Sequence, residues 1–195
     1  MAATLYLIRH GETEWSLDGR HTGRTDLPLT ANGESQARRL APLLQGVGFS
    51  QVLVSPLQRA RRTCELAGLG AQARVDPDLS EWDYGSYEGQ TRAQVQAQRP
   101  HWDVFTDGCP GGESVAQLEA RVDRVRDGLR RAGGRIALFS HGHFLRSLGV
   151  RWLEQPIALG RQLALDAGSL SVLAFEHDDG VTSMIQLWNL QPAGT

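Results

Sequence analysis

The stretch Leu5-Tyr6-Leu7-Ile8-Arg9-His10-Gly11-Glu12-Thr13 decides the fold, because a short apolar run passes directly into polar residues that can carry chemistry. A continuous apolar run of this length is typical of a strand buried inside a sheet. Ligands of open α/β sheets bind at the edge where the carboxyl ends of the strands lie. We therefore expect Arg9, His10 and Gly11 to stand at a ligand-binding edge.

Further apolar runs extend this sheet. Gln51–Val54 and Arg135–Phe139 predict two more buried strands, and long helical stretches separate them from each other and from the first. Leu170–Phe175 and Met184–Trp188 flank an Asp-Gly turn and predict an antiparallel hairpin at one edge. The expected fold is α/β: a three-layer α/β/α sandwich with a mostly parallel central sheet, helices on both faces and a C-terminal antiparallel hairpin.

Capping residues predict where two helices begin after a turn or a strand. Thr30 is a suitable N-cap for a helix through about Leu44. Ser55 followed by Pro56 predicts an N-cap and a first helical residue, for a helix through about Ala67.

Two later helices carry the spacing of a capping box, Thr91 with Gln94 and Ser114 with Gln117. After Ser114, apolar residues recur at steps of three and four and predict the buried face of a helix, formed by Val115, Leu118, Val122, Val125 and Leu129.

The composition is that of one globular domain over residues 1–195, with 41% hydrophobic and 22% charged residues, which excludes a disordered chain. No apolar run approaches the roughly 20 residues that span a bilayer. The N-terminus lacks a basic stretch ahead of its apolar run, so we expect a cytoplasmic protein. A net charge of -2 gives no general attraction for nucleic acid, so any affinity for anions must be local.

The remaining Cys and His residues give no sign of a cofactor or metal. Cys64 and Cys109 are the two cysteines, and neither stands in a zinc-binding spacing. His21, His101 and His177 also lack partner spacing. We expect reduced thiols, no metal and no cofactor; a homodimer is compatible with these features.

Two more groups of polar residues follow the other expected strands. Ser140-His141-Gly142-His143 comes directly after the strand that ends at Phe139, and Arg59 lies near the start of the helix after Val54. If the three strands are neighbours, two guanidinium groups and two imidazoles share one small volume beside the N-termini of helices. That volume suits a phosphoryl group.

Four blocks of sequence together resemble the histidine phosphatase superfamily, which includes the cofactor-dependent phosphoglycerate mutases. The blocks occur in the order of the family and are Leu7–Thr13, Ser55–Ala60, Glu81 ahead of Gly85–Gly89, and Ser140–Gly142. The resemblance implies that His10 is a nucleophile that becomes phosphorylated. It also implies a phosphate pocket of Arg9, Arg59 and His141, with Glu81 as the proton donor to the leaving oxygen.

The resemblance implies further contacts with the substrate. Ser16 stands where the mutases carry an asparagine that contacts phosphate, and Thr22, Gly23 and Gly142 match positions of other family contacts. His143 stands where many relatives have a smaller amide side chain, and it either supports the site or is exposed. Asp78, Asp83 and Glu88 compete with Glu81 for the role of the acid, and the family pattern favours Glu81.

The chemistry of phosphate esters agrees with these roles. A phosphate dianion repels nucleophiles, and Arg9 and Arg59 can neutralise it by bidentate contacts without losing their protons. The same cations lower the pKa of His10, so the ring is expected to be neutral and able to attack. His141 can donate to the phosphoryl oxygens in the transition state.

Three functions share this site, and the segment after Glu81 helps to choose among them. Related mutases carry a long basic insertion there with paired arginines, and a C-terminal tail that closes the site. Here Trp102–Phe105 has no such pair, and the tail is only residues 191–195. We expect a phosphatase that acts on a small phosphorylated metabolite. The alternatives are a phosphoglycerate mutase, for which Arg92 and Arg99 would contact the substrate, and a non-catalytic phospho-ligand binding protein.

Overall fold

The computed structural model describes residues 1–192 and contains a six-stranded sheet with the strand order β3-β2-β4-β1-β5-β6. Four strands pair in parallel, namely β1 (Ala3–Arg9), β2 (Gln51–Val54), β3 (Ala73–Val75) and β4 (Gly134–Ser140). β5 (Leu170–Phe175) runs antiparallel to β1, and β6 (Ser183–Leu190) completes the hairpin with β5. The expected mostly parallel sheet and C-terminal hairpin are confirmed. The expected tail lies partly outside the described residues.

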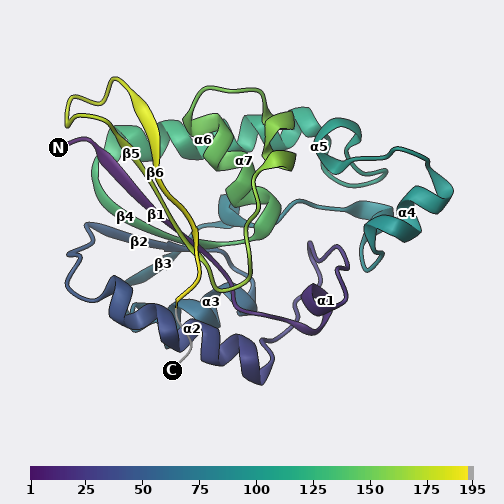
Figure 1. Ribbon diagram of the computed structural model, residues 1–195, viewed down its shortest axis with the longest axis horizontal. Coiled ribbons are helices and arrows are strands. Elements are labelled where there is room, and N and C mark those ends of the chain that lie inside the picture. The colour runs from purple at the N-terminus through teal and green to yellow at the C-terminus, as the bar shows by residue number, and fades with distance from the viewer. Residues whose placement is uncertain (193–195) are drawn as a thin grey trace.

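Helices cover both faces of the sheet (Figure 1). α6 (Val115–Ala132) and α7 (Gly142–Trp152) lie on one face, and α2 (Ala31–Leu44) and α3 (Gln58–Leu66) lie on the other. The short helices are α1 (Glu14–Leu17), α4 (Arg92–Gln98), α5 (Val104–Asp107), η1 (Gly70–Gln72), η2 (Pro77–Leu79), η3 (Gly85–Tyr87) and η4 (Ile157–Gln162). The segment that carries α4 projects from the body on the right of Figure 1. Among residues 1–192, none of the helices is both long and apolar enough to cross a membrane.

The alternation of side chains along the strands divides the core into two clusters. Leu5 and Leu7 of β1 pack with the buried faces of α6 and α7, whereas Ile8 packs with α2 and α3. Four of the five predicted stripe residues of α6 are buried, and Val115 is partly buried against the same cluster. The three-layer sandwich is therefore built by hydrophobic burial on both sides of the sheet.

Most predicted helix starts are confirmed, and one is wrong. The Thr30 side chain accepts a hydrogen bond from the Gly33 N–H, and both predicted capping boxes are formed. Ser55, however, does not cap α3, which begins at Gln58 with Leu57 as an N-cap that makes no side-chain hydrogen bond. The Ser55 hydroxyl accepts the Leu57 N–H at 3.4 Å in a turn ahead of the helix, and it lies 2.7 Å from His141 Nε2.

The end of β1 is held by a close approach between two glycines. A Cβ on Gly11 would lie 2.3 Å from the carbonyl oxygen of Gly33, which no side chain could tolerate. The Glu12 carboxylate accepts hydrogen bonds from Thr30 Oγ1 at 2.6 Å and Asn32 Nδ2 at 2.9 Å. These contacts attach the segment after β1 to the N-terminus of α2 and so fix the direction in which His10 leaves the sheet.

Truncation of the buried face of α6 should destabilise the whole domain. Leu118 is fully buried, so Leu118→Ala should lower the free energy of unfolding by about 2 to 5 kcal/mol. The matched control is Leu17→Ala, because Leu17 is 63% exposed and the same truncation there should cost no more than about 0.5 kcal/mol. Urea denaturation of both variants measures the difference, and equal losses would contradict the assigned core.

Candidate active site

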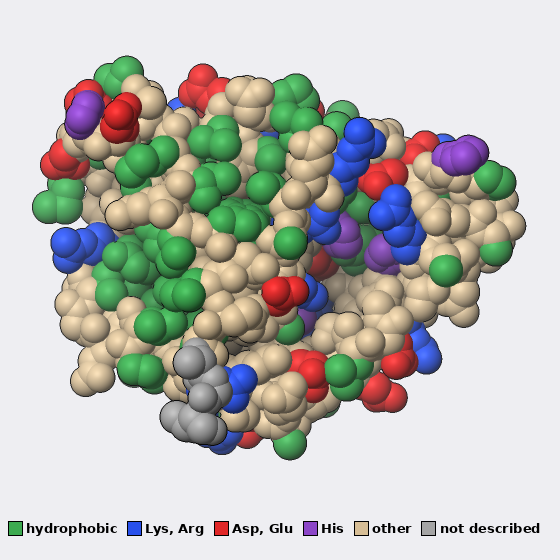
Figure 2. Space-filling view, viewed as in Figure 1, with side chains coloured by type: hydrophobic (Ala, Val, Ile, Leu, Met, Phe, Trp, Pro, Cys, Tyr) green, Lys and Arg blue, Asp and Glu red, His purple; other side chains and the backbone are tan. Residues whose placement is uncertain are grey.

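The ends of three neighbouring strands meet at one edge of the sheet. β4 lies between β2 and β1, with Arg9 opposite Ser140 and Val54 opposite Phe139. The rings of His10 and His141 come together there, with centroids 5.1 Å apart. Figure 2 shows histidine and arginine side chains in a hollow between the body and the projecting segment. The predicted convergence of His10, Arg59 and His141 is thus present in the structure.

His10 is held in one tautomer. Its Nδ1 lies 2.7 Å from the Gly11 carbonyl oxygen, and because a carbonyl can only accept, the proton is on Nδ1. Nε2 therefore carries a lone pair, and it has no hydrogen-bond partner within residues 1–192. Burial holds the pKa of His10 well below 6.5, and the positive charges of Arg59 and Arg9 lower it further. The ring is neutral as predicted, with burial as the larger cause.

Arg59 and His141 form a fully buried pair. The Arg59 Nε–H donates to His141 Nδ1 at 3.1 Å, so the proton of the neutral imidazole is on Nε2, which donates to Ser55 Oγ. The predicted donation from His141 to the phosphoryl oxygens is therefore wrong for this conformation, because the one N–H of the ring is bound to Ser55. Burial also places the pKa of His141 well below 6.5, with Arg59 as the next cause. Ser55 is a site residue that sequence reasoning missed, although its place directly after β2 was the available signal.

The predicted bidentate grip of Arg59 on phosphate is wrong for this conformation. Besides the His141 bond, Arg59 donates to the carbonyl oxygens of Thr25 at 2.8 Å, Thr22 at 3.0 Å and Gly23 at 3.0 Å. A guanidinium has five N–H groups, so no more than one is left for an oxyanion. Arg59 therefore acts on phosphate mainly through its charge, and it also fixes the loop from Thr22 to Thr25.

Thr22 and Gly23 contact the site through their carbonyl oxygens, which accept hydrogen bonds from Arg59. The Gly23 N–H is taken by the Glu88 carboxylate, at 2.9 and 3.1 Å. The Ser16 hydroxyl donates to the Thr13 carbonyl at 2.9 Å, and it accepts the Thr13 N–H in the capping box of α1. The structure thus brings Thr22 and Gly23 to Arg59, and joins Ser16 to Thr13.

Arg9 lies against the start of α7. One of its terminal nitrogens donates to the Leu165 carbonyl, and its Nε is buried without a partner in the described part of the chain. A Cβ on Gly142 would lie 3.4 Å from Arg9 Cζ, so the guanidinium rests on the first turn of the helix. The Gly142 N–H has no acceptor among residues 1–192, and both groups are available to an oxyanion at a helix N-terminus.

Glu81 is bound by backbone N–H groups at that same helix N-terminus. Oε1 accepts from the N–H of Trp82 and of Phe144, both at 2.9 Å, and Oε2 accepts from the N–H of His143 at 3.0 Å. The side chain is buried, with 9% of the residue exposed. Among carboxylates, Glu81 acts most strongly on the pKa of both Arg9 and Arg59, in the raising direction, which places its charge beside both guanidinium groups.

The competing acids are engaged elsewhere. Asp78 pairs with Arg124 at the surface, and Asp83 pairs with Arg24. Glu88 accepts hydrogen bonds from the backbone N–H groups of Gly23 and Thr25. Glu81 remains the carboxylate that acts most strongly on the pKa of Arg9 and of Arg59.

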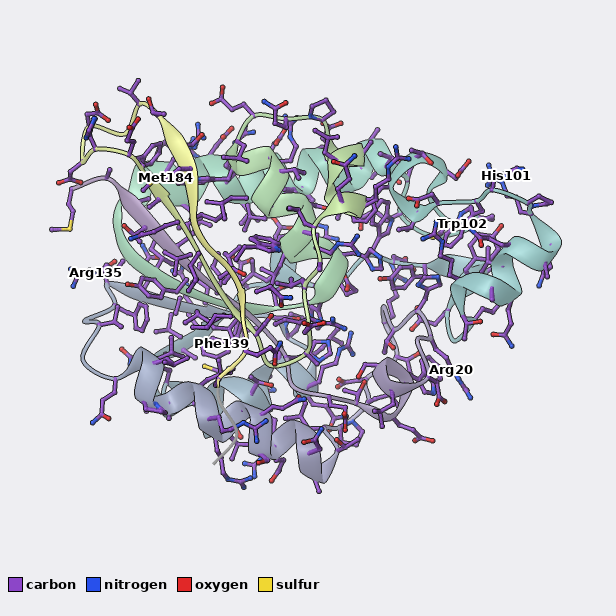
Figure 3. The ribbon with its side chains drawn as sticks, viewed as in Figure 1. Arg20, His101, Trp102, Arg135, Phe139 and Met184 are labelled. Carbon is purple, nitrogen blue, oxygen red and sulfur yellow. The ribbon has the colours of Figure 1, made fainter. Side chains whose placement is uncertain are left out.

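His143 faces inward and belongs to an aromatic cluster. Its Nδ1 lies 2.6 Å from the Tyr84 hydroxyl and 4.0 Å from Glu81 Oε2. Burial lowers the pKa of His143 well below 6.5, and Arg146 is the next cause. His21 stacks on the Tyr84 ring at 4.8 Å and is buried, which its isolated place in the sequence did not signal. His101, labelled in Figure 3 on the segment between α4 and α5, is exposed.

Comparison with known proteins gives consistent matches. A family model described as the histidine phosphatase superfamily (branch 1) matches residues 5–189. An acid phosphatase of Mycobacterium tuberculosis is 45% identical over 177 residues, which cover 89% of this chain and 87% of that protein. A Serratia proteamaculans protein named "Probable phosphoglycerate mutase GpmB" is 34% identical over 203 residues, covering 97% and 92%. The solved structure of the Mycobacterium tuberculosis open reading frame Rv3214 superposes with a TM-score of 0.92 at 39% identity. The match covers 98% of this chain and 99% of that chain.

The buried histidines should make the protein less stable in acid. His10, His141 and His143 have a pKa well below 6.5, and that of His21 is lowered to about 4. Below pH 6.5 the unfolded chain binds protons that the native histidines do not bind. Each of them therefore removes about 1.4 kcal/mol of stability per pH unit, from pH 6.5 down to its native pKa.

Urea denaturation between about pH 7.5 and pH 5 measures this slope. His21→Phe should reduce the slope by the share of one histidine, whereas the exposed-site control His101→Phe should leave it unchanged. A free energy of unfolding that stays constant or rises as the pH falls would contradict the described burial.

Proposed function

Since the chain belongs to the histidine phosphatase superfamily, we propose that it is a phosphatase that hydrolyses small phosphate monoesters through a phosphohistidine on His10. The observation that carries the proposal is the hydrogen bond from His10 Nδ1 to the Gly11 carbonyl. It directs the lone pair of Nε2 away from the backbone, in a ring that burial and two guanidinium groups keep neutral. A neutral, oriented imidazole is the nucleophile that phosphoryl transfer to histidine requires.

The reaction has two displacements at phosphorus. In the first, His10 Nε2 forms a bond to phosphorus while the ester P–O bond breaks and the leaving oxygen takes a proton from Glu81. In the second, water attacks phosphohistidine, Glu81 takes a proton from that water, and the P–N bond breaks to release phosphate. Arg9, the Gly142 N–H and the charge of Arg59 stabilise the phosphoryl oxygens in both steps.

The contacts of Glu81 assign the proton to one oxygen. Oε1 accepts two backbone hydrogen bonds, whereas Oε2 accepts one and lies 4.0 Å from His143 Nδ1. Oε2 has the free lone pair, so it is the atom that holds the proton and delivers it to the leaving group. The backbone N–H groups at the start of α7 keep this oxygen aimed at the site.

Hydrolysis is favoured over the mutase reaction by the projecting segment. Arg92 pairs with Asp103 at 3.2 Å, and Arg99 pairs with Asp107 at 2.9 Å. The two arginines considered for a mutase subsite are thus each engaged by a carboxylate of their own segment. A mutase has to hold the glycerate in place after its phosphoryl group has moved to His10, and so keep water out. Without a subsite that holds the glycerate, water can reach the phosphohistidine.

Loss of the nucleophile should abolish turnover. His10→Ala should lower hydrolysis of para-nitrophenyl phosphate by more than about a thousandfold, since the covalent route is lost. His101→Ala is the matched control, because His101 is exposed and should leave the rate unchanged. Wild type stopped during turnover with radiolabelled substrate should carry a label that is stable in base and labile in acid, and His10→Ala should carry none.

Two outcomes would contradict the phosphatase. Formation of 2-phosphoglycerate from 3-phosphoglycerate by primed enzyme, without release of phosphate, would identify a mutase. Binding of inorganic phosphate without hydrolysis of any ester by wild type would identify a phospho-ligand binding protein.

Removal of the acid should matter most for poor leaving groups. Glu81→Gln should lower kcat/KM for glycerol 3-phosphate by about a hundredfold to ten-thousandfold, because an alkoxide leaves only with a proton. The loss for para-nitrophenyl phosphate should be much smaller, since nitrophenolate needs no proton. Glu65→Gln, at an exposed carboxylate, is the control. Equal losses on both esters would mean that Glu81 is not the acid.

A further inference from the structure

A second group of cationic side chains lines a cavity next to the catalytic acid. The cavity measures about 60 Å³ and opens to solvent, and its wall includes His21, Arg92, Phe105, His143, Arg146 and Arg161. These residues come from separate elements: Arg92 from α4, Arg146 from α7 and Arg161 from η4. Three chain segments thus bring arginines to one place.

Arg146 is held so that its two terminal nitrogens remain free. Its Nε–H donates to the Gly160 carbonyl at 2.9 Å, and Cζ lies 4.8 Å above the Phe105 ring. Its terminal nitrogens have no acceptor among residues 1–192, and the side chain is only partly exposed. A guanidinium that is oriented on one side and unpaired on the other presents a fork suited to an oxyanion.

The cavity has an excess of positive charge. Asp103 is its only carboxylate among the described residues, and that group already pairs with Arg92 and accepts the Phe105 N–H. Three arginines therefore face one carboxylate, and His21 and His143 are neutral. A larger cavity on the other side of Glu81 differs, because every N–H group of its Arg121 has a protein acceptor.

The position of the cavity identifies which part of a substrate would reach it. His143 lines the cavity, and its Nδ1 lies 4.0 Å from Glu81 Oε2. Oε2 is the atom that protonates the leaving oxygen, so the cavity begins directly beyond the leaving group. Burial is the main cause that lowers the pKa of Arg146; Glu81 and Tyr84 raise it, and Arg9 lowers it by a smaller amount, so the charges of the site act on this cavity.

We infer that this cavity binds a second anionic group, carboxylate or phosphate, on the leaving-group part of the substrate. The inference rests on the proposed phosphatase function and narrows its substrates to small phosphate monoesters with another negative charge. Arg146 makes the oriented contact, and Arg161 adds charge at the solvent side, whereas Arg92 is paired with Asp103.

Matched substrate pairs test this with the wild-type enzyme. 3-Phosphoglycerate against glycerol 3-phosphate adds a carboxylate, and fructose 1,6-bisphosphate against fructose 6-phosphate adds a phosphate. We expect kcat/KM for the doubly anionic member of at least one pair to exceed that of its partner by about tenfold or more, beyond the doubling that a second scissile group gives. The pair that shows the preference identifies the anion.

Variants of the cavity should remove this preference selectively. Arg146→Gln should lower kcat/KM for the preferred doubly anionic substrate by about tenfold to a hundredfold, with para-nitrophenyl phosphate changed by less than about threefold. Arg146→Lys should restore part of the loss through its charge. Arg161→Gln, at an exposed residue that should not affect folding, should lower only the doubly anionic rate. Arg131→Gln, at an exposed residue of α6 outside the cavity, is the control and should change neither rate.

The result that would overturn the inference is distinct from failure of the proposed function. If wild type hydrolyses para-nitrophenyl phosphate but prefers neither doubly anionic substrate, the cavity binds no second anion. Equal losses on both substrate classes in Arg146→Gln, without a selective effect of Arg161→Gln, would assign Arg146 to support of the helix and also overturn it. Absence of para-nitrophenyl phosphate hydrolysis in wild type would instead reject the phosphatase.

Discussion

The parallel pairing of β1 with β4 and of β4 with β2 is the constraint on which the rest of the structure depends. Its register sets Arg9 beside Ser140, so the chain enters the site at His10 and His141 from adjacent strands. A slip of one residue would turn every side chain of β1 to the opposite face of the sheet. The two core clusters forbid that slip, because Leu7 must face α6 and α7 while Ile8 faces α2 and α3. The site geometry is therefore set by hydrophobic packing.

Burial of the charged Arg59 guanidinium is costly, and hydrogen bonds to backbone carbonyl groups offset that cost. An unpaired buried guanidinium would be costly, and Arg59 is satisfied by the carbonyl groups of the loop from Thr22 to Thr25 and by His141. The same burial removes water from His10 and lowers its pKa, so the nucleophile stays neutral between two cations. One arrangement thus fixes a loop, orients an imidazole and provides positive charge for a dianion.

The sequence predicts the strand ends well because apolar runs and the residues that follow them are adjacent in the chain. Arg9, His10, Arg59 and His141 could be brought together by topology alone. What depends on individual hydrogen bonds was not predictable: Ser55 follows a strand and precedes a proline, yet its hydroxyl bonds His141 and the Leu57 N–H ahead of α3, and it is not the N-cap of the helix. The bidentate role of Arg59 failed for the same kind of reason, since its acceptors are carbonyls of a loop whose path no local pattern encodes. The cavity around Arg146 combines three distant segments and has no signature in any of them.

The distribution of cations on the two sides of Glu81 bears on the fate of the product. Arg9 and Arg59 are buried, so their attraction for the phosphoryl group is little weakened by water or salt. Arg92 and Arg161 are exposed, and Arg92 is already paired, so the attraction for a second anion on the leaving alcohol is screened. After the first displacement the phosphoryl group stays on His10. The alcohol is then held only on the solvent side of Glu81, where the attraction for an anion is weaker. Weaker retention of the alcohol than of the phosphoryl group favours its replacement by water, which is the order of events that hydrolysis requires.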